Sequence, residues 1–202
     1  MTTFQDMRDA VVVLTKRPEL ATLTDTAIRV ATLRAHQVDF FQRDYASLPL
    51  TYTVPTGNVQ FVDIPDLYTS APLFRTPEFL QGLDSTTLVP CENLEYVNSY
   101  KDFWDEYNEL KSSAFTQMGD TLKVRFAAAT GKATLYYYKN PDVATATYSS
   151  WIADTYKEDL SQWAAAIVWN RTGFQEIGQT TMQQQVVPFQ SLLVESHLTR
   201  KI

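Results

Sequence analysis

Cysteine and histidine, which often build catalytic and metal sites, and glycine, which phosphate-binding loops require, are scarce in this 202-residue sequence. It has one cysteine, two histidines and six glycines. The single cysteine, Cys91, excludes an internal disulfide framework and a metal site built from several thiolates. No basic neighbour or helix start accompanies Cys91, so an ordinary reduced residue is favoured over a reactive thiol. His36 falls within a predicted helix and His197 near the end of the sequence, which argues against paired imidazole ligands or a catalytic imidazole.

Long apolar runs are also absent. No basic segment followed by an apolar stretch begins the sequence, and no stretch is long enough to span a bilayer. We therefore expect a protein made in the cytoplasm, with no membrane partner. The 45% hydrophobic content is sufficient for the core of one domain or of two small ones.

Basic residues are outnumbered, with 17 Lys and Arg against 23 Asp and Glu. The imbalance is concentrated in residues 63–109, where ten acids and two bases give a charge of −8. Proteins that hold nucleic acid cluster Lys and Arg against the phosphates. We therefore expect only weak, non-specific DNA affinity, and an acidic surface suits the wall of a channel through which DNA slides.

The N-terminal region has the pattern of two helices. Thr3 and Asp6 form a capping box for a first helix that ends at Arg17-Pro18, and Thr24 is a suitable N-cap for a second. Pro49 prevents the second helix from extending past residue 48. Apolar residues recur at helical spacing in both helices: Phe4, Met7, Val11 and Leu14, then Ile28, Ala31, Ala35, Val38 and Phe41.

The central region has the pattern of strands. Residues 50–54 and 58–64 flank the turn at 55–57, and residues 122–127 and 133–138 flank the turn at 130–132, which predicts two hairpins. Residues 100–111 have helical spacing.

Two further helices are predicted near the C-terminal end. Residues 150–172 have apolar residues at positions 152, 156, 160, 163 and 167, which predicts a helix roughly 35 Å long. Residues 174–197 predict a second helix that Pro188 kinks or interrupts. The resulting fold class is α+β. Residues 1–48 and 149–202 are expected to form a helical bundle with a C-terminal arm, and residues 49–148 a β-rich insert, either a sandwich or barrel-like.

Residues 177–194 contain no Asp, Glu, Lys or Arg. The Gln and Thr content argues against a membrane segment, and the apolar content argues against a freely solvated one. Two interpretations remain, a core helix and a subunit interface. From about residue 186 onward, we expect an arm that is mobile or differently packed in the free subunit and becomes ordered on a partner.

Several motifs have a structural explanation that is favoured over a functional one. The segment around Gly131-Lys132 lacks the earlier glycine and the following Ser or Thr of a phosphate loop, so it is interpreted as a turn. The acidic row 102, 105, 106 and 109 is a solvated helix face more often than a cation site. Tyr136, Tyr137 and Tyr138 fit core plus interface better than a platform for stacked bases, because adjacent strand residues point to opposite faces. No serine nucleophile elbow occurs.

The order of these segments is similar to that of a known family. The residues that carry the resemblance are Leu33-Arg34, His36, Asp39-Phe40-Phe41 and Asp44, then Thr121-Leu122-Lys123-Val124-Arg125, then Leu135-Tyr136-Tyr137-Tyr138-Lys139-Asn140-Pro141, and finally Ser150-Trp151-Ile152-Ala153. Over most of its length the chain resembles the head-to-tail adaptor (connector) proteins of tailed bacteriophages. It departs from them at Ala127-Ala128-Ala129, where many relatives have prolines.

The resemblance implies a structural protein of the virion neck, made in the host cytoplasm, with no enzymatic activity, cofactor or metal. Subunits would form a twelvefold ring that joins the portal protein to a tail or nozzle protein and lines the DNA channel. The expected portal contacts are Val187, Phe189, Leu192, Leu193, Val194, Arg200 and Lys201. The expected contacts between subunits are Trp151, Trp169 and Met182, and the expected channel-facing acids are Asp102, Asp105, Glu106 and Glu109. The alternatives are another virion ring protein of the tail-terminator type and a small carboxylate-dependent hydrolase.

Overall fold

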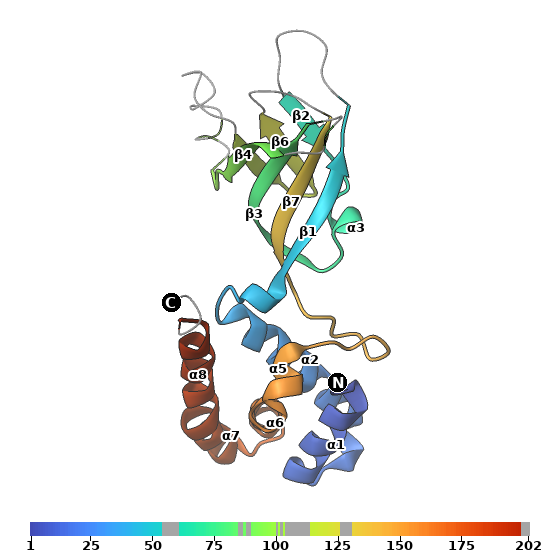
Figure 1. Cartoon of the computed structure of the whole chain (residues 1–202). Helices are drawn as coiled ribbons and strands as arrows, with labels where there is room; N and C mark the ends of the chain where they lie inside the picture. The colour runs from blue at the N-terminus through green and yellow to red at the C-terminus, as the bar shows by residue number, and fades with distance from the viewer. Residues whose placement is uncertain are drawn as a thin grey trace. The chain divides into compact units, whose positions relative to one another are not determined.

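The computed structural model describes residues 1–53, 61–84, 87, 90–99, 101, 103, 114–125 and 131–198. It is a mixed α+β structure, with helices towards both ends of the chain and a seven-stranded sheet formed by its middle (Figure 1). The chain divides into two compact units. Unit 1 comprises Met1–Asp44 and Asn140–Ile202, and unit 2 comprises Tyr45–Lys139. The β-rich insert expected from the sequence, residues 49–148, begins four residues later and ends nine residues later than unit 2.

The first helix of unit 1, α1 (Phe4–Thr15), begins with the predicted capping box. The Asp6 amide donates to Thr3 Oγ1 at 3.1 Å, and the Thr3 amide donates to Asp6 Oδ2 at 2.8 Å. These two bonds satisfy two of the amides that a helix start leaves without partners. The predicted start of this helix is therefore confirmed.

The second helix, α2 (Ala21–Gln37), differs from its prediction at both ends. The 3-10 turn η1 (Pro18–Leu20) leads directly into it, so the N-cap is Leu20. Thr24 is buried inside the helix and is not its N-cap. The helix ends at Gln37 and not near residue 48, because a second 3-10 turn, η2 (Gln42–Asp44), and a strand follow it.

The predicted helix over residues 150–172 is in fact two helices, α5 (Trp151–Thr155) and α6 (Lys157–Arg171). Tyr156, between them, has φ −130° and ψ 47°, outside the helical region. The expected continuous helix of roughly 35 Å is therefore wrong.

The last helical segment continues through Pro188 without a break. It consists of α7 (Gln175–Thr181), the π-helical turn η3 (Met182–Val186) and α8 (Val187–Leu198). In the wider π turn the Val187 amide donates to the Met182 carbonyl five residues earlier. The π turn comes immediately before α8, in which Pro188, without an N–H, is the second residue.

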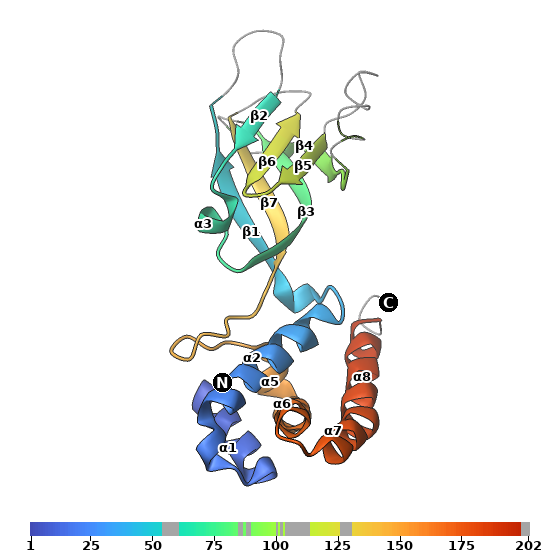
Figure 2. The same cartoon turned by 180° about the vertical axis from the view of Figure 1, so that it is seen from behind.

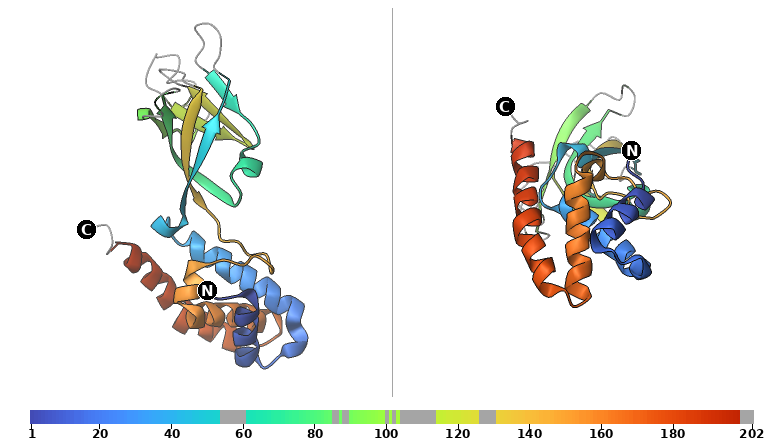
Figure 3. Two further views of the ribbon diagram at one scale, coloured as in Figure 1. Left: turned by 45° about the vertical axis from the view of Figure 1, so that its right-hand side comes forward. Right: turned by 90° about the horizontal axis from the view of Figure 1, so that it is seen from below.

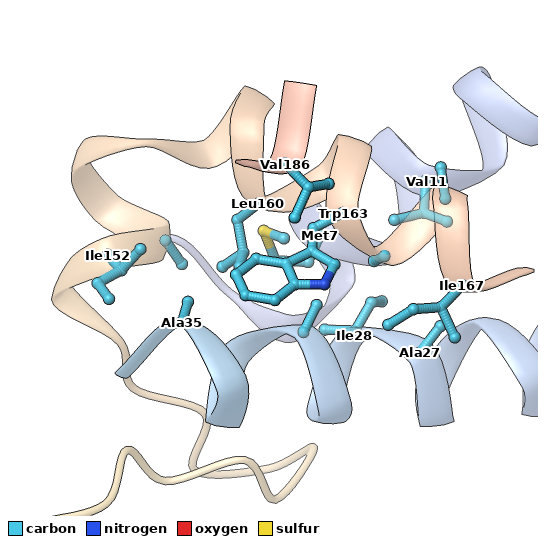
Figure 4. Close-up of a cluster of buried hydrophobic side chains, with 14 of the residues drawn as sticks. Met7, Val11, Ala27, Ile28, Ala35, Ile152, Leu160, Trp163, Ile167 and Val186 are labelled. Carbon is cyan, nitrogen blue, oxygen red and sulfur yellow. The ribbon is translucent and has the colours of Figure 1, made fainter. Parts of the chain in front are cut away.

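Helix α6 lies between α1 and the α7–α8 segment (Figure 3). Its buried residues include Leu160, Trp163, Ile167 and a run of three alanines, Ala164, Ala165 and Ala166. Figure 4 shows the Trp163 indole in the middle of the core, among side chains from α1, α2 and the C-terminal helices. Gly178 of α7 packs closely on α6, since a Cβ at this position would lie 2.4 Å from Asn170 Oδ1.

Unit 2 is a curled sheet with strand order β1-β7-β3-β4-β5-β6-β2 (Figures 1 and 2). Its strands are β1 (Tyr45–Thr51), β2 (Phe61–Ile64), β3 (Phe74–Leu83), β4 (Pro90–Tyr96), β5 (Ala114–Met118), β6 (Thr121–Arg125) and β7 (Lys132–Lys139), with the short helix α3 (Leu67–Ser70) after β2. All neighbouring pairs are antiparallel except β4 and β5. Alternate residues of the strands build one core: Leu80, Leu94, Phe115, Leu122, Val124 and Leu135 are fully buried.

Both predicted hairpins are wrong in the described part of the sheet. Strand β1 pairs with β7 and not with β2, and β6 pairs with β5 and β2 and not with β7. The turn at 55–57 and residue 130 of the turn at 130–132 lie outside the described residues, and Lys132 of the second turn is the first residue of β7. The pairing that the structure shows joins segments far apart in sequence, as in Tyr45 opposite Tyr138.

Candidate functional site

The α8 helix has two sides with different surroundings. Val186, just before it, and Phe189 and Leu193 within it are buried in the core of unit 1. Val187, Gln190, Ser191 and Val194, at helical spacings of three and four residues, share another side. We call these four residues the α8 stripe. They carry no charge, and Val187 is 53% exposed.

The α8 stripe borders an open groove of about 520 Å³ lined by Val38, Gln190, Ser191, Val194 and Glu195. Val38 lies directly after α2, so the groove runs along unit 1 between the end of α2 and the side of α8. Apolar and uncharged polar groups line most of it, and Glu195 is its one acidic lining residue. An accessible surface of this composition suits contact with another protein.

Some of the expected portal contacts are buried within the subunit, and others are accessible. Phe189 and Leu193 are 3% and 0% exposed, because they already pack inside their own subunit. Over residues 186–193 this burial argues against a mobile arm. Val187 and Leu192 are accessible and Val194 is half-buried. Arg200 and Lys201 lie outside the described residues.

The expected contacts between subunits also have partners within unit 1. Trp151 is half-buried, and its indole N–H donates to Asp44 Oδ1 at 2.8 Å. The Arg43 guanidinium lies 5.2 Å from the centre of a Trp151 ring. Trp169 and Met182 are partly buried and pack against the core. The channel-facing acids Asp102, Asp105, Glu106 and Glu109 lie outside the described residues.

A buried polar cluster that the sequence did not reveal joins three parts of unit 1. His36 Nδ1 lies 3.0 and 2.9 Å from the two Asp44 carboxylate oxygens, and His36 Nε2 lies 2.9 Å from Ser150 Oγ. All three residues are 2–3% exposed. Sequence spacing gave no indication of it, because Asp44 and Ser150 are 8 and 114 residues from His36.

The cluster has the residue types of a serine hydrolase triad, but the serine is already engaged. Ser150 is the N-cap of α5, and its Oγ accepts the Ala153 amide at 3.1 Å. A nucleophile must reach the substrate, and Ser150 is 3% exposed. In this conformation the arrangement therefore acts as a structural hydrogen-bond network.

Tyr148 and Thr32 extend the network. The Tyr148 hydroxyl lies 2.9 Å from Thr32 Oγ1, which itself donates to the Ile28 carbonyl at 2.8 Å. Burial raises the pKa of the Tyr148 phenol above its ordinary value, and hydrogen bonds with Thr32 and Ser150 partly oppose this rise.

The raised pKa of Tyr148 predicts a loss of stability in alkali. A group whose pKa is higher in the folded state stabilises the fold fully below its unfolded pKa, about 10 for tyrosine, and this contribution is lost as pH rises through the folded pKa. We expect the free energy of unfolding to fall above about pH 10, and to fall less steeply in Tyr148→Phe. Urea titrations followed by circular dichroism from pH 8 upward measure both slopes. Equal slopes for the two proteins would contradict the assignment to Tyr148.

The three consecutive tyrosines lie in β7 of unit 2. Tyr137 is buried in the core, and Tyr136 and Tyr138 lie on the opposite face, as strand alternation predicted. The Tyr136 ring stacks on Phe79 with centroids 4.4 Å apart and on Tyr45 at 5.9 Å. Because these rings cover one another's faces, they do not offer a free platform for bases.

No family model matches the chain, and no curated protein is significantly similar to it. Among the residues that the structure describes, no three or more His, Cys, Asp or Glu side chains gather as metal ligands would. No helix in the described part of the chain has the length and apolar character of a membrane span.

Proposed function

We propose that this chain is a head-to-tail adaptor of a tailed bacteriophage, a structural protein that forms a twelvefold ring between portal and tail around the DNA channel. The observation that carries this proposal is the uncharged α8 stripe beside its groove. One side of α8 is fixed in the core by Phe189 and Leu193, and another side presents Val187 to solvent. An uncharged helix face on a rigid support can dock on another protein with little loss of conformational freedom.

The finer architecture belongs to the same proposal. We interpret unit 1 as a helical bundle that carries the portal contact, with α6 at its centre. We interpret the curled sheet of unit 2 as a barrel-like insert that faces the tail. Both follow from the resemblance of the sequence to adaptor proteins, and the mixed α+β structure with helices towards both ends of the chain is compatible with them.

The acidic segment supports a channel role. Residues 63–109 have a charge of −8, and like charge repels the phosphates of DNA within about a Debye length. Within this proposal, Asp102, Asp105, Glu106 and Glu109 face the channel and prevent the genome from adhering to the wall.

Purified protein also tests the two alternatives, a tail-terminator ring and a hydrolase. A tail-terminator ring would assemble on a tail tube and not on the portal. For the enzyme alternative the sequence pointed to a carboxylate-dependent hydrolase, whereas the one observation in the structure, the Asp44–His36–Ser150 arrangement, points to a serine hydrolase. A serine-reactive fluorophosphonate that labels Ser150 in the native protein would support it, whereas the proposed adaptor should remain unlabelled.

Electron microscopy of the purified protein mixed with its cognate portal protein tests the proposal directly. We expect one twelvefold ring of this protein on one end of the portal. Monomers that remain separate from the portal at micromolar concentration, while other neck proteins of the same phage bind it, would overturn the proposal.

A further inference from the structure

The buried polar cluster joins the residue at which the chain leaves unit 1 to the start of α5, ten residues after the chain returns at Asn140. Asp44 is the last residue of the first stretch of unit 1, and strand β1 begins at Tyr45. Ser150 caps α5 in the second stretch, which begins at Asn140. One imidazole, that of His36, contacts both of these residues.

Each connection has additional anchors to unit 1. The Asp44 amide donates to the Phe41 carbonyl at 2.9 Å. In the returning segment the Ser149 amide donates to the Asp142 carbonyl at 2.9 Å, and Arg29 Nη2 of α2 donates to Thr145 Oγ1 at 3.0 Å. These anchors hold each connection separately.

The cluster links the two connections through buried side chains. Asp44 accepts hydrogen bonds from His36 and from Trp151, the residue after Ser150. Ser150 Oγ in turn accepts the Ala153 amide. In a network with almost no solvent access, the loss of one partner leaves the others unsatisfied, because water cannot replace it.

We propose that the Asp44–His36–Ser150 cluster is a coupling joint, which makes the order of one connection depend on the order of the other. A substitution at Asp44 therefore weakens the hydrogen bond that caps α5, and a substitution at Ser150 weakens the hydrogen bond at the end of η2. By linkage the two effects are reciprocal.

Amide hydrogen exchange measured by NMR at fixed pH tests the joint in the full chain. In Asp44→Asn, we expect the Ala153 amide to exchange about tenfold faster, although residue 44 is far from it in sequence. In Ser150→Ala, we expect the residue 44 amide to exchange about tenfold faster. The matched control is Ser161→Ala, which removes an equally buried hydroxyl that donates to the Lys157 carbonyl at 2.7 Å, outside the cluster.

The exchange rates of the α1 amides distinguish a loosening of the whole fold from an effect of the joint, because the three residues of the joint do not contact these amides. If Val11 and Ala153 accelerate equally in Asp44→Asn, the milder His36→Gln variant replaces it, and the same two amides are compared. Acceleration confined to the substituted connection would overturn the proposal. Strictly additive effects in the Asp44→Asn/Ser150→Ala double variant would also overturn it, since coupled sites are non-additive.

Discussion

Replacing Trp163 by alanine is expected to destabilise the protein by about 3–5 kcal/mol, the usual range for removing a fully buried tryptophan. The side chain is 1% exposed and lies between α1, α2 and the C-terminal helices (Figure 4). Its ring meets Phe189 of α8 edge to face, with centroids 6.5 Å apart. The cavity left by alanine would therefore remove contacts from several helices at once.

Trp163→Phe is the matched variant, and it should cost clearly less. The Trp163 indole N–H is buried without an acceptor among the residues that the structure describes, a condition that costs about 1–3 kcal/mol. Phenylalanine retains an aromatic ring and removes this unsatisfied donor. Urea unfolding followed by circular dichroism compares the two variants with the wild type. Equal losses for alanine and phenylalanine would show that the N–H has a partner and that ring volume is not the main contribution.

Two charges placed on the α8 stripe are expected to abolish portal docking. Val187→Asp together with Ser191→Asp places carboxylates on accessible positions of the stripe beside the groove. Burying unpaired carboxylates in an interface costs several kcal/mol, so we expect affinity for the portal to fall by roughly a hundredfold or more. Co-sedimentation with the portal protein measures this loss, and it depends on the proposed function.

Two controls make the docking result specific. Leu192→Asp changes a residue of similar exposure to Val187, 45% against 53%, on a different side of α8. Val13→Asp changes the 73% exposed Val13 of α1. Val13→Asp should fold and dock as the wild type does. Leu192→Asp separates the stripe from Leu192, which the sequence also named as a portal contact, and on the stripe proposal it too should dock normally. Equal loss in Leu192→Asp would extend the contact beyond the stripe, and normal docking by the double variant would exclude the stripe as the contact.

Truncation of residues 190–202 is a poorer test than these substitutions. A mobile arm could be removed without unfolding the subunit, but Leu193 is fully buried in the core of unit 1. The truncated protein would therefore lose core contacts together with any partner contact. For the uncharged residues 177–194 the sequence left two interpretations, a core helix and a subunit interface. One side of α8 is core and another is exposed, so α8 is compatible with both.

Local features were predictable from the sequence, because they depend on residues a few positions apart. The capping box at Thr3 and Asp6 and the buried positions Ile152, Leu160, Trp163 and Ile167 were all identified correctly. The break at Tyr156 was not, because the helical spacing of apolar residues continues across it.

Strand pairing and the buried polar cluster could not be predicted from the sequence pattern, because both join residues far apart in the chain. Hairpin rules pair neighbouring strands, whereas β7 lies between β1 and β3 and not beside β6. The same reason hid the polar cluster, because His36 and Ser150 meet only after the chain has passed through unit 2 and returned. A histidine inside a predicted helix gives no signal of a partner 114 residues away.

Unit 1 is built from two stretches of chain separated by unit 2, and this determines which unit can fold first during synthesis. Unit 2 is one continuous stretch, Tyr45–Lys139, and all its strands are synthesised before α6 begins at Lys157. Until then, α1 can contact α2 but lacks its contacts with α6. At typical elongation rates this interval is on the order of ten seconds. The nascent N-terminal helices therefore keep apolar side chains exposed until α6 is made, and unit 2 is the part that can fold first.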